Sequence, residues 1–182
     1  MDLSATEKEE KEYDYVSDEV VERTIPVIND KTKIINPYID ADVTVGKNYY
    51  DYKETEDKQI NSILVHDNTY MQNTGIDYIK KEQFEIVSIL DGTVTNVKED
   101  ENIGKIVEIK HNNGIVSMYE SLSEVKVKKG DTINQGQVIG ISGENEIEKE
   151  LGNHLHFEIY ENGQTVNPEN YLNKEVTIKE AN

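Results

Sequence analysis

Short β-like runs separated by glycine-containing turns constrain the fold of this chain more than any other feature of its sequence. Between residues 84 and 161 the runs are FEIVSIL, GTVTNVKE, GKIVEIKH, GIVSMYES, QVIGISG and HLHFEIYE. The breaks between them include Asp-Gly, Asn-Asn-Gly and Lys-Lys-Gly-Asp, which are residues that tight turns favour. Runs of this length at regular spacing predict a mainly β fold, with an antiparallel sheet or sandwich and short helical turns.

The chain as a whole divides into four predicted parts. An acidic tail over 1–23 has nine acids against three bases and is predicted to be disordered. A β-rich lead-in follows over 24–60 and contains the polar stretch KETEDKQIN, which we interpret as a loop. The main β domain covers 61–172, and NEIEKEL within it predicts one helical turn. A polar tail over 173–182 is expected to fray.

Composition excludes several classes of function. The chain of 182 residues has no cysteine, so disulfides and thiolate metal sites are excluded. Its formal net charge of −18 repels nucleic acid, anionic membrane surfaces and an anionic cell wall. A protein partner or a small substrate is therefore favoured. No run approaches the roughly 20 apolar residues of a membrane span. A fragment cut from an anchor and a natural cytoplasmic protein would both look like this.

The run HLHFEIYE places two histidines and an acid on one face of a strand. Side chains at i and i+2 share a face, so His154, His156 and Glu158 are expected on an exposed face, while the apolar residues between them enter the core. Imidazole and carboxylate groups so placed can bind metal or move protons, although an isolated pair of histidines often only forms hydrogen bonds. His66 and His111 fall outside this run and are predicted to lie on the surface.

The segment directly upstream gives the histidine pair a context. VKVKKGDTINQGQVIGISG, residues 125–143, contains Gly-Asp-x-x-x-x-Gly-Gln, which is two tight glycine turns joining strands. Lipoyl and biotinyl carrier domains share this signature. Followed at once by His-x-His, it resembles the lysostaphin/LytM family of peptidoglycan metallopeptidases. The resemblance implies the antiparallel LytM fold, which is a duplicated hybrid motif.

The resemblance implies a zinc site. It makes His156 a ligand and His154 a general acid or base. Two further ligands belong to a His-x-Gly-x-Asp pattern, matched here by NTGID, so Asp77 is a ligand and Asn73 occupies the histidine position. Residues four apart in a straight strand lie roughly 13 Å apart, so Gly75 is expected to allow a bend. An amide oxygen is a weaker zinc ligand than imidazole, which predicts weak or absent zinc.

A second departure concerns catalysis. Active relatives carry Tyr-x-His-Leu-Ser before the glycine hairpin, and its histidine helps hold the attacking water or the transition state. Here MYESLSEV puts Ser121 at that position, and the neighbouring Glu120 is expected to face away. The resemblance then implies a degenerate site in which His154 is vestigial and no peptide is cleaved. The alternative is a working zinc-dependent peptidoglycan endopeptidase that uses Asp77, His156 and Asn73.

Two longer stretches narrow the resemblance. INPYIDADVTVGKNYYDY and YMQNTGIDYIKKEQFEIVSILDGTVTNV resemble the clostridial type of the stage II sporulation protein Q group. This implies a forespore membrane protein with one N-terminal span and an ectodomain in the space between forespore and mother cell. There it binds stage III sporulation protein AH, forming a channel or zipper that supports engulfment. Residues 1–23 would then be the juxtamembrane stalk of a soluble fragment.

Two points stay open in the sequence. Asn73 is either natural divergence or a replacement of a ligand histidine. The partner-binding surface is expected to be an exposed sheet edge, and both the lead-in over 24–50 and the run over 104–119 are candidates.

Overall fold

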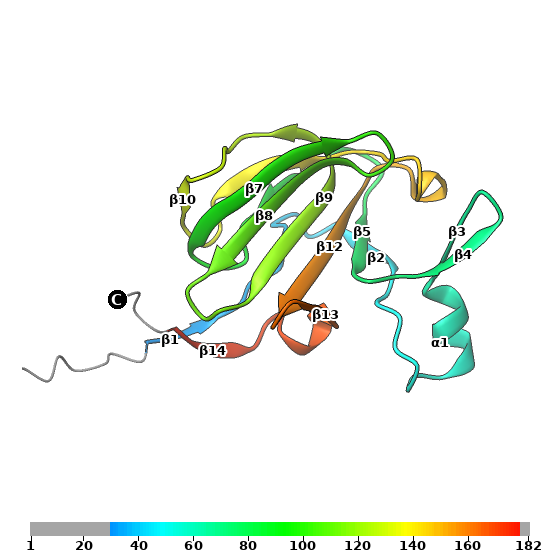
Figure 1. The fold of residues 1–182 in the computed structure, drawn as a ribbon, viewed down its shortest axis with the longest axis horizontal. Helices are drawn as coiled ribbons and strands as arrows, with labels where there is room; N and C mark the ends of the chain where they lie inside the picture. The colour runs from blue at the N-terminus through cyan, green and yellow to red at the C-terminus, as the bar shows by residue number, and fades with distance from the viewer. Residues whose placement is uncertain (1–29, 179–182) are drawn as a thin grey trace, which may run out of the picture.

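The body of the protein is one curved antiparallel sheet, which confirms the predicted mainly β fold (Figure 1). The computed structural model describes residues 30–178, so the predicted tail over 1–23 lies outside the described residues. The ten-stranded sheet runs in the order β10-β7-β8-β9-β12-β5-β2, with β6, β11 and β13 attached beside this path. The long strands at its centre are β7 (Gly92–Asp100), β8 (Gly104–His111), β9 (Val116–Val125) and β12 (His154–Glu161).

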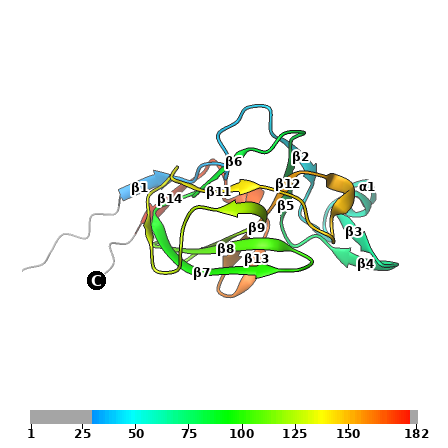
Figure 2. The ribbon, with the colours of Figure 1, turned by 90° about the horizontal axis from the view of Figure 1, so that it is seen from above.

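Shorter strands complete the sheet. One end is formed by β5 (Ile76–Ile79) and β2 (Thr44–Lys47), and the other by β10 (Thr132–Ile133). The attached strands are β6 (Glu85–Val87), β11 (Val138–Ser142) and β13 (Gln164–Val166). The sheet curls so that β6 and β11 lie across from β7 and β8 (Figure 2).

The core fills the inside of this curl because the strands alternate apolar and polar side chains. Leu155, Phe157 and Ile159 of β12 are fully buried, as the alternation predicted. The ring of Phe157 packs against that of Tyr119 from β9, with centroids 5.3 Å apart. Ile34, from the lead-in, belongs to the same core.

Two small units flank the sheet at opposite ends (Figure 1). At one end β1 (Asp30–Lys33) pairs with β14 (Glu175–Ile178), so this part of the polar tail forms a strand instead of fraying. At the other end a hairpin of β3 (Ile63–His66) and β4 (Thr69–Gln72) projects beside α1 (Glu56–Asn61). The predicted polar loop is therefore partly helical, and acids in the first turn of α1 suit the helix dipole.

Two 3-10 turns complete the described elements, Lys149–Leu151 and Pro168–Asn170. The first lies within the helical turn that was predicted over 145–151. Within residues 30–178 no helix has the length and apolar character needed to cross a membrane.

His111 is a correction, because it is buried and not on the surface. It is the last residue of β8 and sits opposite Gly92, so the turn begins only after it. Its Nδ1 lies 3.0 Å from the carbonyl oxygen of Asp91, and its Nε2 lies 2.7 Å from Ser117 Oγ. Burial lowers the pKa of His111 to about 4.

Candidate metal centre

Strand register brings Asp77 and His156 together. In the antiparallel pair of β5 and β12, His156 lies directly opposite Asp77, and opposed residues share a face of the sheet. Asp77 Oδ1 is 2.7 Å from His156 Nδ1. The two residues that sequence reasoning selected as metal ligands are therefore in direct contact.

The histidine face of β12 is buried, which corrects the expectation of an exposed face. His154 is 0% exposed, and His156 and Glu158 are each 5% exposed. Leu64 and Met71 from the β3–β4 hairpin line the same groove as His156, together with residues of the segment 145–148. Single-strand periodicity identifies the face, but it cannot show that other segments fold over it.

Asn73 does not offer its oxygen to the pair. Its Nδ2 donates to Asp77 Oδ2 at 2.9 Å and to the carbonyl oxygen of Asn48 at 3.1 Å, and its Oδ1 accepts from the Gly75 amide at 3.3 Å. Both partners of Nδ2 can only accept, so the orientation of the amide is determined. Asn73 therefore orients Asp77 and leaves Oδ1 of that carboxylate facing His156.

Gly75 is needed for close approach. A Cβ at this position would lie 2.4 Å from the carbonyl oxygen of Phe157 and 2.9 Å from His156 Nε2, which are distances that real contacts do not reach. The backbone before β5 thus passes directly against β12 beside the imidazole. The sequence predicted that Gly75 allows a bend. The structure shows a further reason for glycine here, because β12 lies too close to leave room for a side chain.

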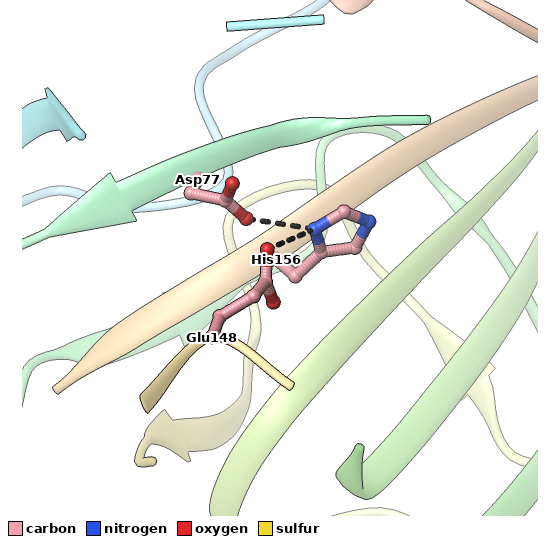
Figure 3. A group of neighbouring side chains, drawn as sticks. All are labelled: Asp77, Glu148 and His156. Carbon is pink, nitrogen blue, oxygen red and sulfur yellow. Dashed lines mark hydrogen bonds and ion pairs between the residues drawn. The ribbon is translucent and has the colours of Figure 1, made fainter. Parts of the chain in front are cut away.

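Glu148 joins Asp77 and His156, and sequence reasoning missed it. One oxygen of each carboxylate and a ring nitrogen of His156 lie within 4.8 Å of one another. Figure 3 shows both carboxylates directed at the same nitrogen of His156; Glu148 Oε1 is 3.5 Å from Nδ1. Nothing in NEIEKEL separates Glu148 from the acids around it, so only the fold could reveal this neighbour.

Ser121 and His154 form a second buried pair. Ser121 Oγ lies 2.9 Å from His154 Nε2 and accepts from Asn145 Nδ2 at 2.7 Å. His154 Nδ1 is 2.7 Å from the carbonyl oxygen of Gly152, to which its N–H donates. Ser121 and His154 are both fully buried, so neither side chain contacts solvent.

Glu120 corrects the expectation that it would face away from the site. It lies opposite His156 in the β9–β12 pair and lines the same groove. Alternation would send Ser121 to the far face, but its positive φ of 63°, where the pairing of β9 with β8 is irregular, turns it towards His154. Burial raises the pKa of Glu120 to about 7, against the opposing effect of His156.

Carboxylates dominate the electrostatics around His156. Asp77 and Glu148 face its Nδ1, and Glu158 Oε1 lies 3.4 Å from its Nε2. Burial by itself would lower the pKa of His156, but the carboxylates, Asp77 foremost, outweigh burial and raise the pKa well above its usual range. Burial likewise opposes ionisation of Glu148, but the hydrogen bond from His154 and the nearby charge of His156 outweigh burial and lower the pKa of Glu148.

This donor set fits a divalent transition-metal ion. One imidazole nitrogen and two carboxylate oxygens are ligands that zinc accepts. Glu158, on the other ring nitrogen of His156, is the outer-shell carboxylate that commonly orients a ligating histidine. Glu148 Oε1 is buried without a hydrogen-bond partner, and a cation would satisfy it.

Comparisons with known proteins identify the family of this chain. Residues 71–168 match the model of peptidase family M23. Stage II sporulation protein Q of Bacillus subtilis (strain 168) is 38% identical over 144 residues, which cover 78% of this chain and 51% of that protein. The chain thus spans about half the length of that relative.

Solved structures extend the similarity. One described as the SpoIIQ-SpoIIIAH pore forming complex matches with a TM-score of 0.77 and 37% identity, covering 79% of this chain and 93% of the matched chain. A zinc containing peptidase from Vibrio cholerae shares the fold, with a TM-score of 0.61 and 21% identity, over 75% of this chain and 39% of that one. Since the family model matches more than half of the sequence, the chain belongs to peptidase family M23.

Proposed function

We propose that this chain is the ectodomain of a SpoIIQ-type sporulation protein, whose M23 domain binds a SpoIIIAH-type partner and does not cleave peptidoglycan. The observation that carries the proposal is the similarity to SpoIIQ as it occurs in two structures of its complex with SpoIIIAH, at 37% and 36% identity. In this role the protein is anchored in the forespore membrane. It meets the partner in the space between forespore and mother cell, within a channel or zipper that supports engulfment.

The replaced residues support a binding role over an enzymatic one. Asn73 is held by Asp77 and Gly75, so it supplies no ligand oxygen, and zinc binding is weaker than in a site with a histidine there. Ser121 occupies the place of a catalytic imidazole and instead hydrogen-bonds His154. His154 is thereby vestigial, because it is fully buried and paired with Ser121 and Glu148.

The sheet edge at β2 is the proposed contact surface. The run over 104–119 was wrong as a candidate, because β8 lies between β7 and β9, and β9 lies between β8 and β12. Within residues 30–178, β2 from the lead-in ends the strand order and pairs on one side only, so its other side suits strand addition. Val45 on β2 is 47% exposed, and Ile39 nearby is 70% exposed.

Co-elution tests this proposal. We expect the chain and a SpoIIIAH ectodomain to form one complex in gel filtration at micromolar concentrations. Val45→Glu should weaken the complex, because it puts a charge where the partner strand would pack. Val65→Glu is the matched control, since Val65 is 50% exposed on the β3–β4 hairpin. No complex at any micromolar concentration would refute the partner, and equal effects of both variants would refute the β2 edge.

A second candidate function is the zinc-dependent endopeptidase, favoured by the contact between Asp77 and His156. It requires water to replace the imidazole lost at Ser121. We expect no release of muropeptides from purified peptidoglycan at any zinc concentration. Zinc-dependent release that His154→Ala abolishes would establish the enzyme and overturn the proposed loss of catalysis.

A further inference from the structure

One buried side-chain oxygen in the described part of the chain lacks a hydrogen-bond partner. It is Oε1 of Glu148, a side chain that is only 3% exposed. A buried carboxylate oxygen without a donor is costly, so it indicates a missing cation or an ordered water. From this atom and its neighbours we propose that Glu148 is a metal ligand: with Asp77 and His156 it holds one divalent transition-metal ion of the zinc class, compensating for Asn73.

The segment that carries Glu148 is built to present this oxygen. Asn145 Oδ1 accepts from the Glu148 amide at 2.6 Å, and Asn145 Nδ2 donates to Glu148 Oε2 at 2.9 Å. His154 Nε2 lies 3.3 Å from the same Oε2. Because Oε2 is held twice, the carboxylate cannot rotate freely, and Oε1 stays directed at His156 (Figure 3).

The other two ligands are held in the same way. Asp77 Oδ2 accepts from Asn73, which leaves Oδ1 for the ion. His156 Nε2 faces Glu158, which leaves Nδ1 for the ion. In both residues one polar atom is fixed by a neighbour and the other points to a common centre, as is usual for metal ligands.

The separations are those of a site that closes around an ion with a small adjustment. Ligands of a tetrahedral zinc ion lie about 3.4 Å apart, given bonds of about 2.0–2.1 Å. Glu148 Oε1 and His156 Nδ1 are 3.5 Å apart. Asp77 Oδ1 and His156 Nδ1 are 2.7 Å apart, so that pair must open when an ion replaces the shared proton.

A purely structural role for Glu148 makes a different prediction. As the counter-ion of two histidines it would contribute to folding but have no effect on metal affinity. Metal affinity therefore separates the two roles, and the measurement involves neither catalysis nor the partner. Failure of this inference would leave the partner-binding proposal intact.

The test is zinc titration calorimetry and elemental analysis on the chain and three variants. We expect the unmodified chain to bind one zinc per chain. Glu148→Gln keeps the shape of the side chain and removes its charge. Losing an outer-shell partner of a metal costs about tenfold to a hundredfold in affinity, so losing a direct ligand should weaken zinc affinity by more than about a hundredfold. Glu146→Gln is the matched control, because Glu146 lies on the same segment with an exposed side chain, and it should bind as the unmodified chain does.

Glu148→Asp keeps the charge, but its shorter side chain moves the carboxylate oxygen away from the metal, so zinc binding should also weaken. This variant provides the test if Glu148→Gln fails to fold. Melting curves with and without zinc give a second readout, since a ligand of the native state raises the melting temperature. Two results would overturn the assignment. One is no zinc in the unmodified chain at millimolar concentration, and the other is unchanged affinity in both Glu148 variants.

Discussion

At the scale of single residues, Asn73 fixes its neighbours through hydrogen bonds. Its amide donates to Asp77 and accepts from the Gly75 backbone, so it braces the carboxylate that an imidazole at this position would join on a metal. The same site contains Ser121, whose hydroxyl fills the space beside His154. These two polar side chains are compatible with the strand register that brings Asp77 opposite His156.

Asn73→His should strengthen metal binding, because the backbone before β5 and the position of Asp77 already suit a ligand there. At zinc a hundredfold above the dissociation constant the native state gains about 2.7 kcal/mol. The measurement is the zinc-dependent shift in melting temperature, compared with the unmodified chain. Under the proposed loss of catalysis, this variant should show no peptidase activity, since the Ser121 side chain supplies no imidazole. Equal zinc responses in both proteins would show that this position does not limit binding.

At the scale of elements, the sequence predicted the positions of the strands well, but it predicted their pairing and order poorly. The runs of alternating residues became β7, β8, β9, β11 and β12 close to their expected bounds, because glycine turns and side-chain period are local signals. The pairing of β5 with β12, which joins Asp77 to His156, was reached only through a family resemblance. Strand order also determines which strands lie at the edges of the sheet. In the observed order the run over 104–119 lies inside the sheet.

Sequence reasoning missed residues whose place in the site depends on contacts between distant parts of the chain or on a break in the alternation of a strand. Glu148 lies on an irregular segment, and its importance comes from His156 on the next strand. Glu120 and Ser121 are adjacent, yet both reach the site, because the positive φ of Ser121 breaks the period of two. The pattern of a single sequence does not predict such an irregularity in a strand.

At the scale of the whole molecule, the buried imidazole of His111 makes stability depend on pH. Its pKa falls from 6.5 to about 4 through burial, so between these values the unfolded chain binds a proton that the folded chain does not. This contribution to stability is complete above pH 6.5 and is lost as pH falls towards 4. The difference corresponds to about 3 kcal/mol.

His111→Gln should remove this part of the pH dependence, because glutamine keeps hydrogen-bonding atoms and cannot become charged. We expect urea midpoints of the variant to change less between pH 7 and pH 4 than those of the unmodified chain. His66→Gln is the matched control, with a side chain that is 32% exposed. Parallel pH curves for the unmodified chain and His111→Gln would contradict the prediction.

The pairing of β1 with β14 also determines how the protein carries mechanical load. Asp30 lies opposite Ile178 and Lys33 opposite Glu175, so both strands join the body at the same end. Tension on Asp30 therefore passes along β1 without shearing it from β14. The force enters the body at Ile34, which is fully buried and tied by backbone hydrogen bonds to Lys174 at 2.9 Å and Asn173 at 2.8 Å. A pull from the N-terminal side is thus borne by the core and by the segment before β14 together.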